Sequence, residues 1–503
     1  MKTTQSARSQ ASTPARPSKN GAAAHPLSPR CLDGSKRLLE RNEQWIPGGV
    51  VSLNRKCDPN IAFARGVGSR VWDVDGNEYI DYQAGFAAFF LGHNDPDVNA
   101  AVARVLGEQR TLMGAGPTEL EGELAELICR HVPTLDKVQL TNTGSEATFL
   151  AIRIARAATG RDHVIIIQGG YNGWHNDVAA NVISNLADVG RRVSPGEYPF
   201  DPLSAGIPEV QKSHVHIVNF NDLDSMVYVL ERYPVACVII EPILQNVGVI
   251  KPQPGYLTGL RRLTEEHGCL LIFDEVKTGF RHALTGYQGL CGVTPDLSTF
   301  GKALANGYPI GVIGGKREFM DYFVHPERSK RVLIAGTYNA HPIPTAAAIA
   351  TIRKLASPEH RVYEHVEKLG QLLEAGLKKI LRPFGCPFFL ARQGSAFCLY
   401  FMDHEPRDYH DLAALHDFDL DRRYRIELIQ RGVYHFPLPI KQGSISFAHT
   451  KQDIEETLDI TAQALDAVLG RKGNTEVLRG GPSARSAGRG KSATSGNTGG
   501  LKR

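Results

Sequence analysis

The chain has 503 residues, of which 42% are apolar and 22% are charged, and its formal net charge is +4 at pH 7. This composition predicts a soluble globular protein of two or three domains. No apolar run reaches the roughly 18 residues that cross a bilayer, and the N-terminus lacks the apolar segment of a secretory signal, so we expect neither membrane insertion nor export.

Both ends of the chain are basic and poor in large apolar residues. Residues 1–32 hold five Lys/Arg and no acid, and residues 471–503 hold eight Lys/Arg and one acid. Such segments cannot offset the entropy lost on ordering, so we predict disordered extensions over residues 1–36 and 471–503. The N-terminal one could also be a transit peptide or a nucleic-acid contact. Because neither interleaves aromatic residues with its charges, we expect no nucleic-acid partner.

The eight cysteines are scattered singly through the sequence. They form no CxxC pair and no His/Cys group at ligand spacing, so we expect no metal site. The pattern is typical of reduced thiols and predicts a cytoplasmic protein.

Strand-like and helix-like segments alternate between the two tails. The strand-like runs are short, β-branched and apolar on both faces, which is typical of a mainly parallel sheet wrapped by helices. Ligands of such sheets bind at the carboxyl ends of the strands. We therefore predict a large α/β domain over residues 96–350. Its expected strands are 164–167, 215–220, 235–240, 269–274 and 311–315, and its expected helices are 145–159, 225–233 and 256–268.

The pattern changes after about residue 350. Long helical segments flank a few short strands, which predicts a smaller α+β domain over residues 351–470, to which residues 37–95 contribute an N-terminal segment. The expected helices are 363–381 and 452–469, and short strands are expected near 397–401 and 444–449.

The stretch TNTGSEAT (141–148) follows a strand-like segment and opens a helix. Gly144 allows a close backbone approach, and Ser145 with the free amides of the helix start would form a cup for an anion such as phosphate. An ordinary helix cap is the alternative, because Thr143 or Ser145 followed by Glu146 would serve that purpose equally well.

An aromatic ring and a carboxylate follow two further strands. Tyr171 lies in the Gly-rich loop GYNGWHND (170–177) and could stack on a flat heterocycle, although aromatic residues are common in surface loops. Asp274 ends the apolar run of LLIFDEVKTGFR (270–281). A buried carboxylate there requires a cationic or strongly donating partner, such as a protonated pyridine nitrogen. We expect Glu275 to point to the opposite side of the turn and to support it.

Lys302 lies in the glycine-flanked turn of STFGKALANGYPIGVIGG (298–315). A solvated surface lysine is one interpretation. Held in a site beside a cation, its pKa falls and it becomes a nucleophile for carbonyl groups. A phosphate cup, a stacking ring, a carboxylate for a ring nitrogen and an imine-forming lysine are together what pyridoxal phosphate requires.

These motifs, with GTYNAHP (336–342), resemble the class-III aminotransferases of pyridoxal phosphate fold type I, and most closely their glutamate-1-semialdehyde aminomutase branch. The similarity extends from IPGGV (46–50) to FAHT (447–450). It implies an α/β fold with a seven-stranded, mainly parallel sheet in the large domain and a smaller α+β domain.

The resemblance also implies roles for individual residues. Lys302 would form the Schiff base and shuttle the proton, Asp274 would pair with the pyridine nitrogen, and Val276 would pack under the ring. Gly144 and Ser145 would hold the phosphate. Thr337 would reach the phosphate bound by the neighbouring subunit, which implies a homodimer with shared active sites. Tyr171 would stack on the cofactor, and Arg55 would bind the substrate carboxylate.

Two departures from the family pattern bear on the reaction. Where the family has a histidine after the stacking tyrosine, this chain has Asn172. Where the aminomutase pattern has a glutamate, this chain has Lys441, which would attract a second carboxylate or point to water. We also expect Trp174 and His175 to line or border the pocket. Since the acidic residue is lost, we favour transfer of an amino group from an amino-acid or amine donor to a 2-oxo acid, with an intramolecular aminomutase reaction as the alternative.

Two other hypotheses differ in kind. Racemisation or decarboxylation on the same cofactor would need no oxo-acid acceptor. A non-catalytic role of the basic tails would give salt-sensitive nucleic-acid binding that a Lys302→Ala change leaves intact.

Overall fold

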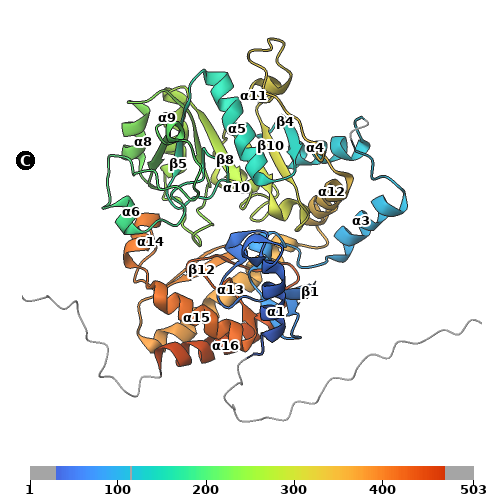
Figure 1. Ribbon diagram of the computed structural model, residues 1–503, viewed down its shortest axis with the longest axis vertical. Helices are drawn as coiled ribbons and strands as arrows, with labels where there is room; N and C mark the ends of the chain where they lie inside the picture. The colour runs from blue at the N-terminus through green and yellow to red at the C-terminus, as the bar shows by residue number, and fades with distance from the viewer. Residues whose placement is uncertain (1–29, 114–115, 471–503) are drawn as a thin grey trace, which may run out of the picture.

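The computed structural model describes residues 30–113 and 116–470. Figure 1 shows two lobes. We call the seven-stranded sheet and the helices packed on it the large lobe, and the two smaller sheets with helices α13, α15 and α16 the small lobe. Residues 1–29 and 471–503, most of the two predicted extensions, lie outside the described residues.

The large lobe is built on a sheet with strand order β4-β10-β9-β8-β7-β5-β6. Strand β10 is antiparallel to β4 and β9, and the other neighbours are parallel. The mainly parallel sheet of the predicted α/β fold is thus confirmed. Its strands are β4 (Lys137–Thr141), β5 (His163–Ile167), β6 (Val215–Val218), β7 (Val235–Ile240), β8 (Leu270–Glu275), β9 (Leu297–Gly301) and β10 (Gly311–Gly315).

Helices lie against both faces of this sheet, because its central strands are buried along their whole length. Helix α5 packs on β7, β9 and β10, and α12 packs on α3 and α4 at one side of the lobe (Figure 1). The longer helices are α3 (Pro96–Gly107), α4 (Glu119–His131), α5 (Gly144–Thr159), α8 (Leu223–Leu230), α9 (Tyr256–Glu266) and α12 (Pro342–Ala356). The short ones are α6 (Leu186–Val189), α7 (Glu209–Lys212), α10 (Gly286–Cys291) and α11 (Arg317–Met320).

The small lobe combines two sheets, of order β1-β2-β3-β13 and β11-β12-β14, with three long helices. The strands are β1 (Phe63–Val67), β2 (Arg70–Asp73), β3 (Glu78–Asp81), β11 (Phe389–Gln393), β12 (Ala396–Tyr400), β13 (Val433–Tyr434) and β14 (Gly443–Ser444). The helices are α1 (Asp33–Glu43), α2 (Ala84–Ala87), α13 (Val362–Leu381), α14 (Tyr409–Leu415), α15 (Phe418–Arg431) and α16 (Lys451–Leu469).

One hydrophobic cluster joins the two lobes. Phe90, Phe300 and Phe397 belong to it and are buried. Burial of such rings is worth roughly 2 kcal/mol each, so the lobes pack as one body around the cleft between them. The predicted domain boundaries, which divide the chain by residue number, remain a proposal.

Three elements differ from the sequence prediction. Helix α1 begins at Asp33, inside the predicted extension 1–36, because the Asp75 carboxylate accepts hydrogen bonds from the amides of Gly34 and Ser35. The strand expected over 444–449 is reduced to β14, since Ile445 N donates to Ser395 O but Phe447 N donates to Phe90 O, in another segment. Strand β9 was not expected, because its buried centre is polar.

Candidate functional site

The carboxyl ends of the large-lobe strands meet at one cavity of about 370 Å³. Asp274 ends β8 and Lys302 follows β9, and these two strands are parallel neighbours in which Asp274 pairs with Thr299. Tyr171, in the loop after β5, lines the same cavity. The fold therefore brings together the ring, the carboxylate and the lysine that the sequence singled out.

Asp274 is buried and fully hydrogen-bonded. Its Oδ1 accepts from Val276 N and from Thr299 Oγ1, each at 3.0 Å, and its Oδ2 accepts from Asn172 Nδ2 at 2.8 Å. Burial raises the pKa of Asp274 above its ordinary value, and the charge of Lys302 acts in the opposite direction. A buried carboxylate of this kind is stabilised by a nearby cation.

Lys302 opens the short helix η3 (Lys302–Ala305) and lines the cavity. Its φ of +46° lies in the left-handed region, where a side chain other than glycine is strained. Such strain gathers at functional sites, where the surrounding structure holds a side chain in one direction. Burial lowers the pKa of Lys302, with Asp274 and Glu241 acting in the opposite direction. The ammonium group therefore loses its proton more readily than a surface lysine does.

A second cavity of about 280 Å³ lies at the start of helix α5 and shares Tyr171, Asp274, Val276 and Lys302 with the first. A Cβ on Gly144 would lie 2.8 Å from the Val276 side chain, so only glycine leaves this cup open.

The helix cap at this point does not need Ser145. Thr143 Oγ1 accepts from Glu146 N at 3.2 Å, and Glu146 Oε2 accepts from Thr143 N at 3.1 Å, which is a capping box. The cap that the sequence offered as an alternative is therefore present, and it leaves the Ser145 hydroxyl and the first amides of α5 for a ligand.

Glu275 points away from the cavity, as expected. Its Oε1 accepts from Gln288 N at 3.0 Å and its Oε2 from Tyr287 N at 2.6 Å and Thr278 Oγ1 at 2.9 Å. It thereby ties the turn after β8 to the start of α10.

Six polar residues of the cavity were not singled out from the sequence: Asn54, Gln83, Glu241, Asn246, Lys277 and Gln442. Glu241 directly follows the apolar strand β7, much as Asp274 follows the apolar residues of β8, so the same reasoning could have found it. Its Oε1 accepts from Tyr171 N at 2.8 Å and its Oε2 from Gln245 N at 3.0 Å, and burial raises its pKa. Glu241 thus positions the loop that carries Tyr171.

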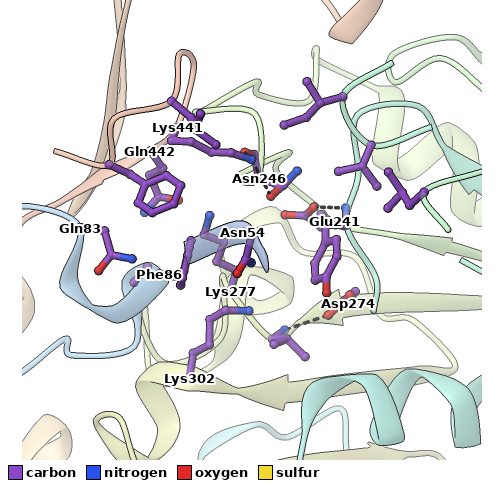
Figure 2. A pocket seen from close by; sticks show the side chains of 18 residues that line it. Asn54, Gln83, Phe86, Glu241, Asn246, Asp274, Lys277, Lys302, Lys441 and Gln442 are labelled. Carbon is purple, nitrogen blue, oxygen red and sulfur yellow. Dashed lines mark hydrogen bonds between the residues drawn. The ribbon is translucent and has the colours of Figure 1, made fainter. Parts of the chain in front are cut away.

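Lys441 lines the cavity, as Figure 2 shows. Four other predicted residues do not belong to the lining of either cavity among the described residues. Trp174 is 70% exposed, and Arg55 and Thr337 are exposed too, while Asn54 beside Arg55 does reach the cavity. His175 is buried, with its Nε2 3.2 Å from Thr148 Oγ1.

The sequence profile of the aminotransferase class-III family matches residues 52–387. The chain belongs to the class-III aminotransferase family. Among curated relatives of this aminotransferase, glutamate-1-semialdehyde 2,1-aminomutase 2 of Brevibacillus brevis is 39% identical over 86% of the chain and 98% of the relative. Glutamate-1-semialdehyde 2,1-aminomutase of Syntrophomonas wolfei is 37% identical over 86% of the chain and 98% of the relative.

Solved structures agree with this membership. An omega-transaminase from Sphaerobacter thermophilus superposes with a TM-score of 0.80 and 32% identity, covering 86% of the chain and 97% of that protein. A glutamate-1-semialdehyde aminomutase variant from Pseudomonas aeruginosa PAO1, in complex with PMP, gives a TM-score of 0.76 and 26% identity over 87% and 95%. The chain is an enzyme of this family, its substrates are small molecules, and its cofactor is pyridoxal 5'-phosphate.

The residues of the aminotransferase fit this cofactor. The cup at Gly144 is open and lies at the N-terminus of the 16-residue helix α5, which suits a phosphate. Asp274 lies where both cavities meet and needs a cation, which a protonated pyridine nitrogen supplies. Lys302 lines both cavities, so it would be the amine that holds the cofactor through its aldehyde group.

Two observations complete the survey of the described residues. In residues 30–113 and 116–470, no group of His, Cys, Asp and Glu side chains is arranged to hold a metal ion. Over the same ranges, no helix has the length and the apolar character that a membrane span requires.

Proposed function

We propose that this enzyme moves an amino group on a small acid, with Lys302 as the amine that binds the cofactor aldehyde and then carries the substrate proton. The observation that supports it is the meeting of Lys302, Asp274 and Tyr171 at one cavity whose neighbour is a phosphate cup. The cofactor, when bound, withdraws electrons from the substrate carbon that loses its proton.

Each residue has a definite task in this proposal. Asp274 keeps the ring nitrogen protonated, and Asn172 and Thr299 orient its carboxylate. Tyr171 stacks on the ring and Val276 packs under it. Gly144 and Ser145 hold the phosphate. Lys302, whose pKa is lowered by burial, takes and returns the proton.

The first candidate reaction is the intramolecular one, a glutamate-1-semialdehyde aminomutase type of isomerisation. The sequence analysis preferred transfer between molecules, but the curated relatives bear the aminomutase name at 37–39% identity. This finding favours the alternative over the reaction first preferred.

Intermolecular transfer to a 2-oxo acid is the second candidate. Lys441 faces the cavity, and it replaces the acid of the aminomutase pattern. The similarity to an omega-transaminase, at 32% identity, also favours transfer between molecules. The positive charge of Lys441 would attract a second, acidic substrate such as a 2-oxo acid. Only the intermolecular reaction uses such a second substrate.

Two assays separate the candidates. The enzyme loaded with pyridoxal phosphate is mixed with glutamate-1-semialdehyde alone, and the isomer with the amino group on carbon 1 is measured. In parallel, amines and α-, β- and ω-amino acids are added, and conversion of the cofactor is followed by absorbance, with and without 2-oxo acids. Isomer formation without any oxo acid supports the first candidate. A spectrum that only oxo acids restore supports the second, and no spectral change with any substrate contradicts both.

The proposal includes a homodimer and a cytoplasmic location. Thr337 is exposed, and Asn339 in the same segment accepts a hydrogen bond at 3.0 Å from Asn142, which lines the phosphate cup. A second copy placed on this surface would bring its own Thr337 to the phosphate, and Arg55 could likewise reach a site through that interface. All cysteines of the described residues are free thiols, as in a reducing compartment.

Gly144→Ala should weaken cofactor binding by roughly 10-fold or more, because the new Cβ meets the Val276 side chain and narrows the cup; overpacking of this kind costs about 1–3 kcal/mol. Fluorescence titration of the cofactor-free enzyme measures the Kd. Gly122→Ala on α4 is the control, since nothing lies within 4 Å of its Cβ position. Equal affinity in both variants would place the phosphate elsewhere.

Lys441→Met should raise stability at pH 7. Burial lowers the pKa of Lys441 to about 8, with Glu241 acting in the opposite direction, whereas an unfolded lysine titrates near 10.4. Between these values the unfolded chain binds the proton and the folded chain does not, so wild-type stability rises with pH through this window. Below about pH 8 the buried charge costs about 3 kcal/mol.

Melting curves of Lys441→Met and wild type between pH 7 and 10.5 test this expectation. The excess stability of Lys441→Met over wild type should shrink as the pH rises from about 8 to about 10.4. Lys451→Met is the control, because that ammonium group is exposed. An advantage that stays constant with pH, or that is absent at pH 7, contradicts the lowered pKa.

A further inference from the structure

We propose that Lys277 and Lys441 together form a subsite for a substrate carboxylate remote from the reacting carbon at Lys302. The inference rests on the proposed function, because it names how the acid is held, and it moves the carboxylate anchor away from Arg55. The ligand class is an amino or oxo acid whose carboxylate is separated by several carbons from the reacting amine or carbonyl group.

The two ammonium groups converge on consecutive carbonyl groups. Lys277 Nζ donates to Gln245 O at 2.7 Å, and Lys441 Nζ donates to Asn246 O at 3.1 Å. Both residues line the cavity of about 370 Å³ that contains Lys302. In Figure 2 Lys302 lies at one end of the cavity and Lys441 at the other, with Lys277 between them. Since an ammonium group has three protons, each lysine retains donors for a ligand.

Asn246 supplies an independent observation. Its Oδ1 accepts from Lys441 Nζ at 3.2 Å, which fixes the orientation of the amide. Its buried Nδ2 has no hydrogen-bond partner among the described residues. A buried donor without an acceptor costs about 1–3 kcal/mol. A carboxylate oxygen held by the two lysines would satisfy it.

The charges of the cavity wall favour an anion. Neither Lys277 nor Lys441 forms an ion pair within residues 30–113 and 116–470, and both bond to neutral carbonyl groups. Glu241 is the carboxylate that raises the pKa of both lysines. Its oxygens already accept hydrogen bonds from the backbone amides of Tyr171 and Gln245. Burial lowers the pKa of both lysines. A bound carboxylate would offset that burial and keep them charged.

The small lobe holds Lys441 rigidly. Ile440 N donates to Asp421 Oδ2 at 2.7 Å, and Lys441 O accepts from Arg425 Nη2 at 3.0 Å. Asp421 and Arg425 form a buried ion pair at 2.7 Å on helix α15. Lys277 is also constrained, because it lies in the turn directly after strand β8, which contains Asp274. Two cations fixed on two lobes define both the place and the distance at which a carboxylate is accepted.

Binding of glutarate, with its neutral diamide as the matched probe, tests the subsite. Calorimetry on the full chain loaded with pyridoxal phosphate should give wild-type affinity for glutarate at least 10-fold above that for the diamide. Lys277→Met and Lys441→Met should each reduce this ratio several-fold, and the double variant should bring it to about one. Lys451→Met should leave it unchanged. A double variant that keeps the wild-type ratio, or a wild type that does not prefer glutarate, overturns the proposal.

The pH dependence of glutarate binding by wild type tests the subsite without any variant that could misfold. The groups that act on the Lys441 charge are Glu241, Arg425 and Cys398, and Lys441 in turn acts on Lys277. Because the pKa of Lys441 is about 8, the affinity of wild type for glutarate should fall at least 5-fold between pH 7 and pH 9.5. A constant affinity contradicts the subsite.

The same samples distinguish a failure of this inference from a failure of the proposed function. The cofactor absorbance is recorded after addition of a neutral amine and of an amino acid with a remote carboxylate. If wild type converts both but the double variant shows the same preference for the acid, the subsite is wrong and the function stands. If wild type binds glutarate as expected but converts no amine, the proposed function is wrong and the anion subsite stands.

Discussion

Replacing Lys302 by alanine should lower kcat by about 10⁴-fold or more, because the variant loses both the amine that binds the cofactor aldehyde and the base that moves the substrate proton. Stopped-flow absorbance with a reactive amine measures the single-turnover rate. Lys368→Ala is the control, since that lysine is exposed on α13 and pairs with Glu364.

Borohydride reduction of the loaded enzyme gives a second readout for Lys302. In wild type the chromophore should become fixed to the peptide that contains Lys302, and in the alanine variant it should wash out. Lys277 and Lys441 are the other lysines that line the cavity among the described residues. A chromophore fixed at Lys277, or a variant that retains a tenth of wild-type kcat, would show that Lys302 is not the reacting amine.

Asp274→Asn should lower kcat by about 10²- to 10⁴-fold. The change keeps the size of the side chain but removes the charge that holds the ring nitrogen protonated, so the ring withdraws electrons less strongly. Because the amide oxygen can still accept from Val276 N and Thr299 Oγ1, and the Asn172 amide can turn its oxygen toward the new amide group, the melting temperature of the cofactor-free protein should stay nearly unchanged. Steady-state kinetics and the absorbance maximum of the bound cofactor measure the effect.

Glu275→Gln is the matched control for Asp274→Asn. The two acids are adjacent in sequence and both are buried, but Glu275 bonds to Tyr287, Gln288 and Thr278 rather than facing the cavity. Its replacement should lower stability by about 1–3 kcal/mol and change kcat of the folded enzyme less than 10-fold. Equal losses of kcat in both variants would argue that Asp274 acts only through the turn.

The fold was predictable where the composition of a segment is typical of a buried strand. The runs at β5, β7 and β8 are short, β-branched and buried on both faces, so their positions follow from local sequence. Strand β9 escaped because Ser298 and Thr299 lie at its buried centre, and their polar groups are satisfied by Gln288 and Asp274. No local pattern reveals such partners, which come from other strands and helices.

The site was predictable to the same extent. Asp274 lies near the end of a recognisable strand and Lys302 lies in a glycine-flanked turn, and the sheet brings the carboxyl ends of β8 and β9 together. In the remote half of the cavity Lys441 was expected from the resemblance, but Asn246 was not, because the two residues are far apart in sequence and meet only through lobe packing. Arg55 and Thr337 were inferred from resemblance alone, and both are exposed in the single chain.

The hydrogen bond between Lys441 and Asn246 has a consequence for how selectivity could change. It joins a residue held by helix α15 to a loop that follows strand β7. In the proposed subsite, substrate preference therefore depends on the packing of the two lobes as well as on the cavity lining. A substitution at Asp421, which bonds to Ile440 N beside Lys441, should shift Lys441 and change which acids are accepted while Lys302 and Asp274 keep their places.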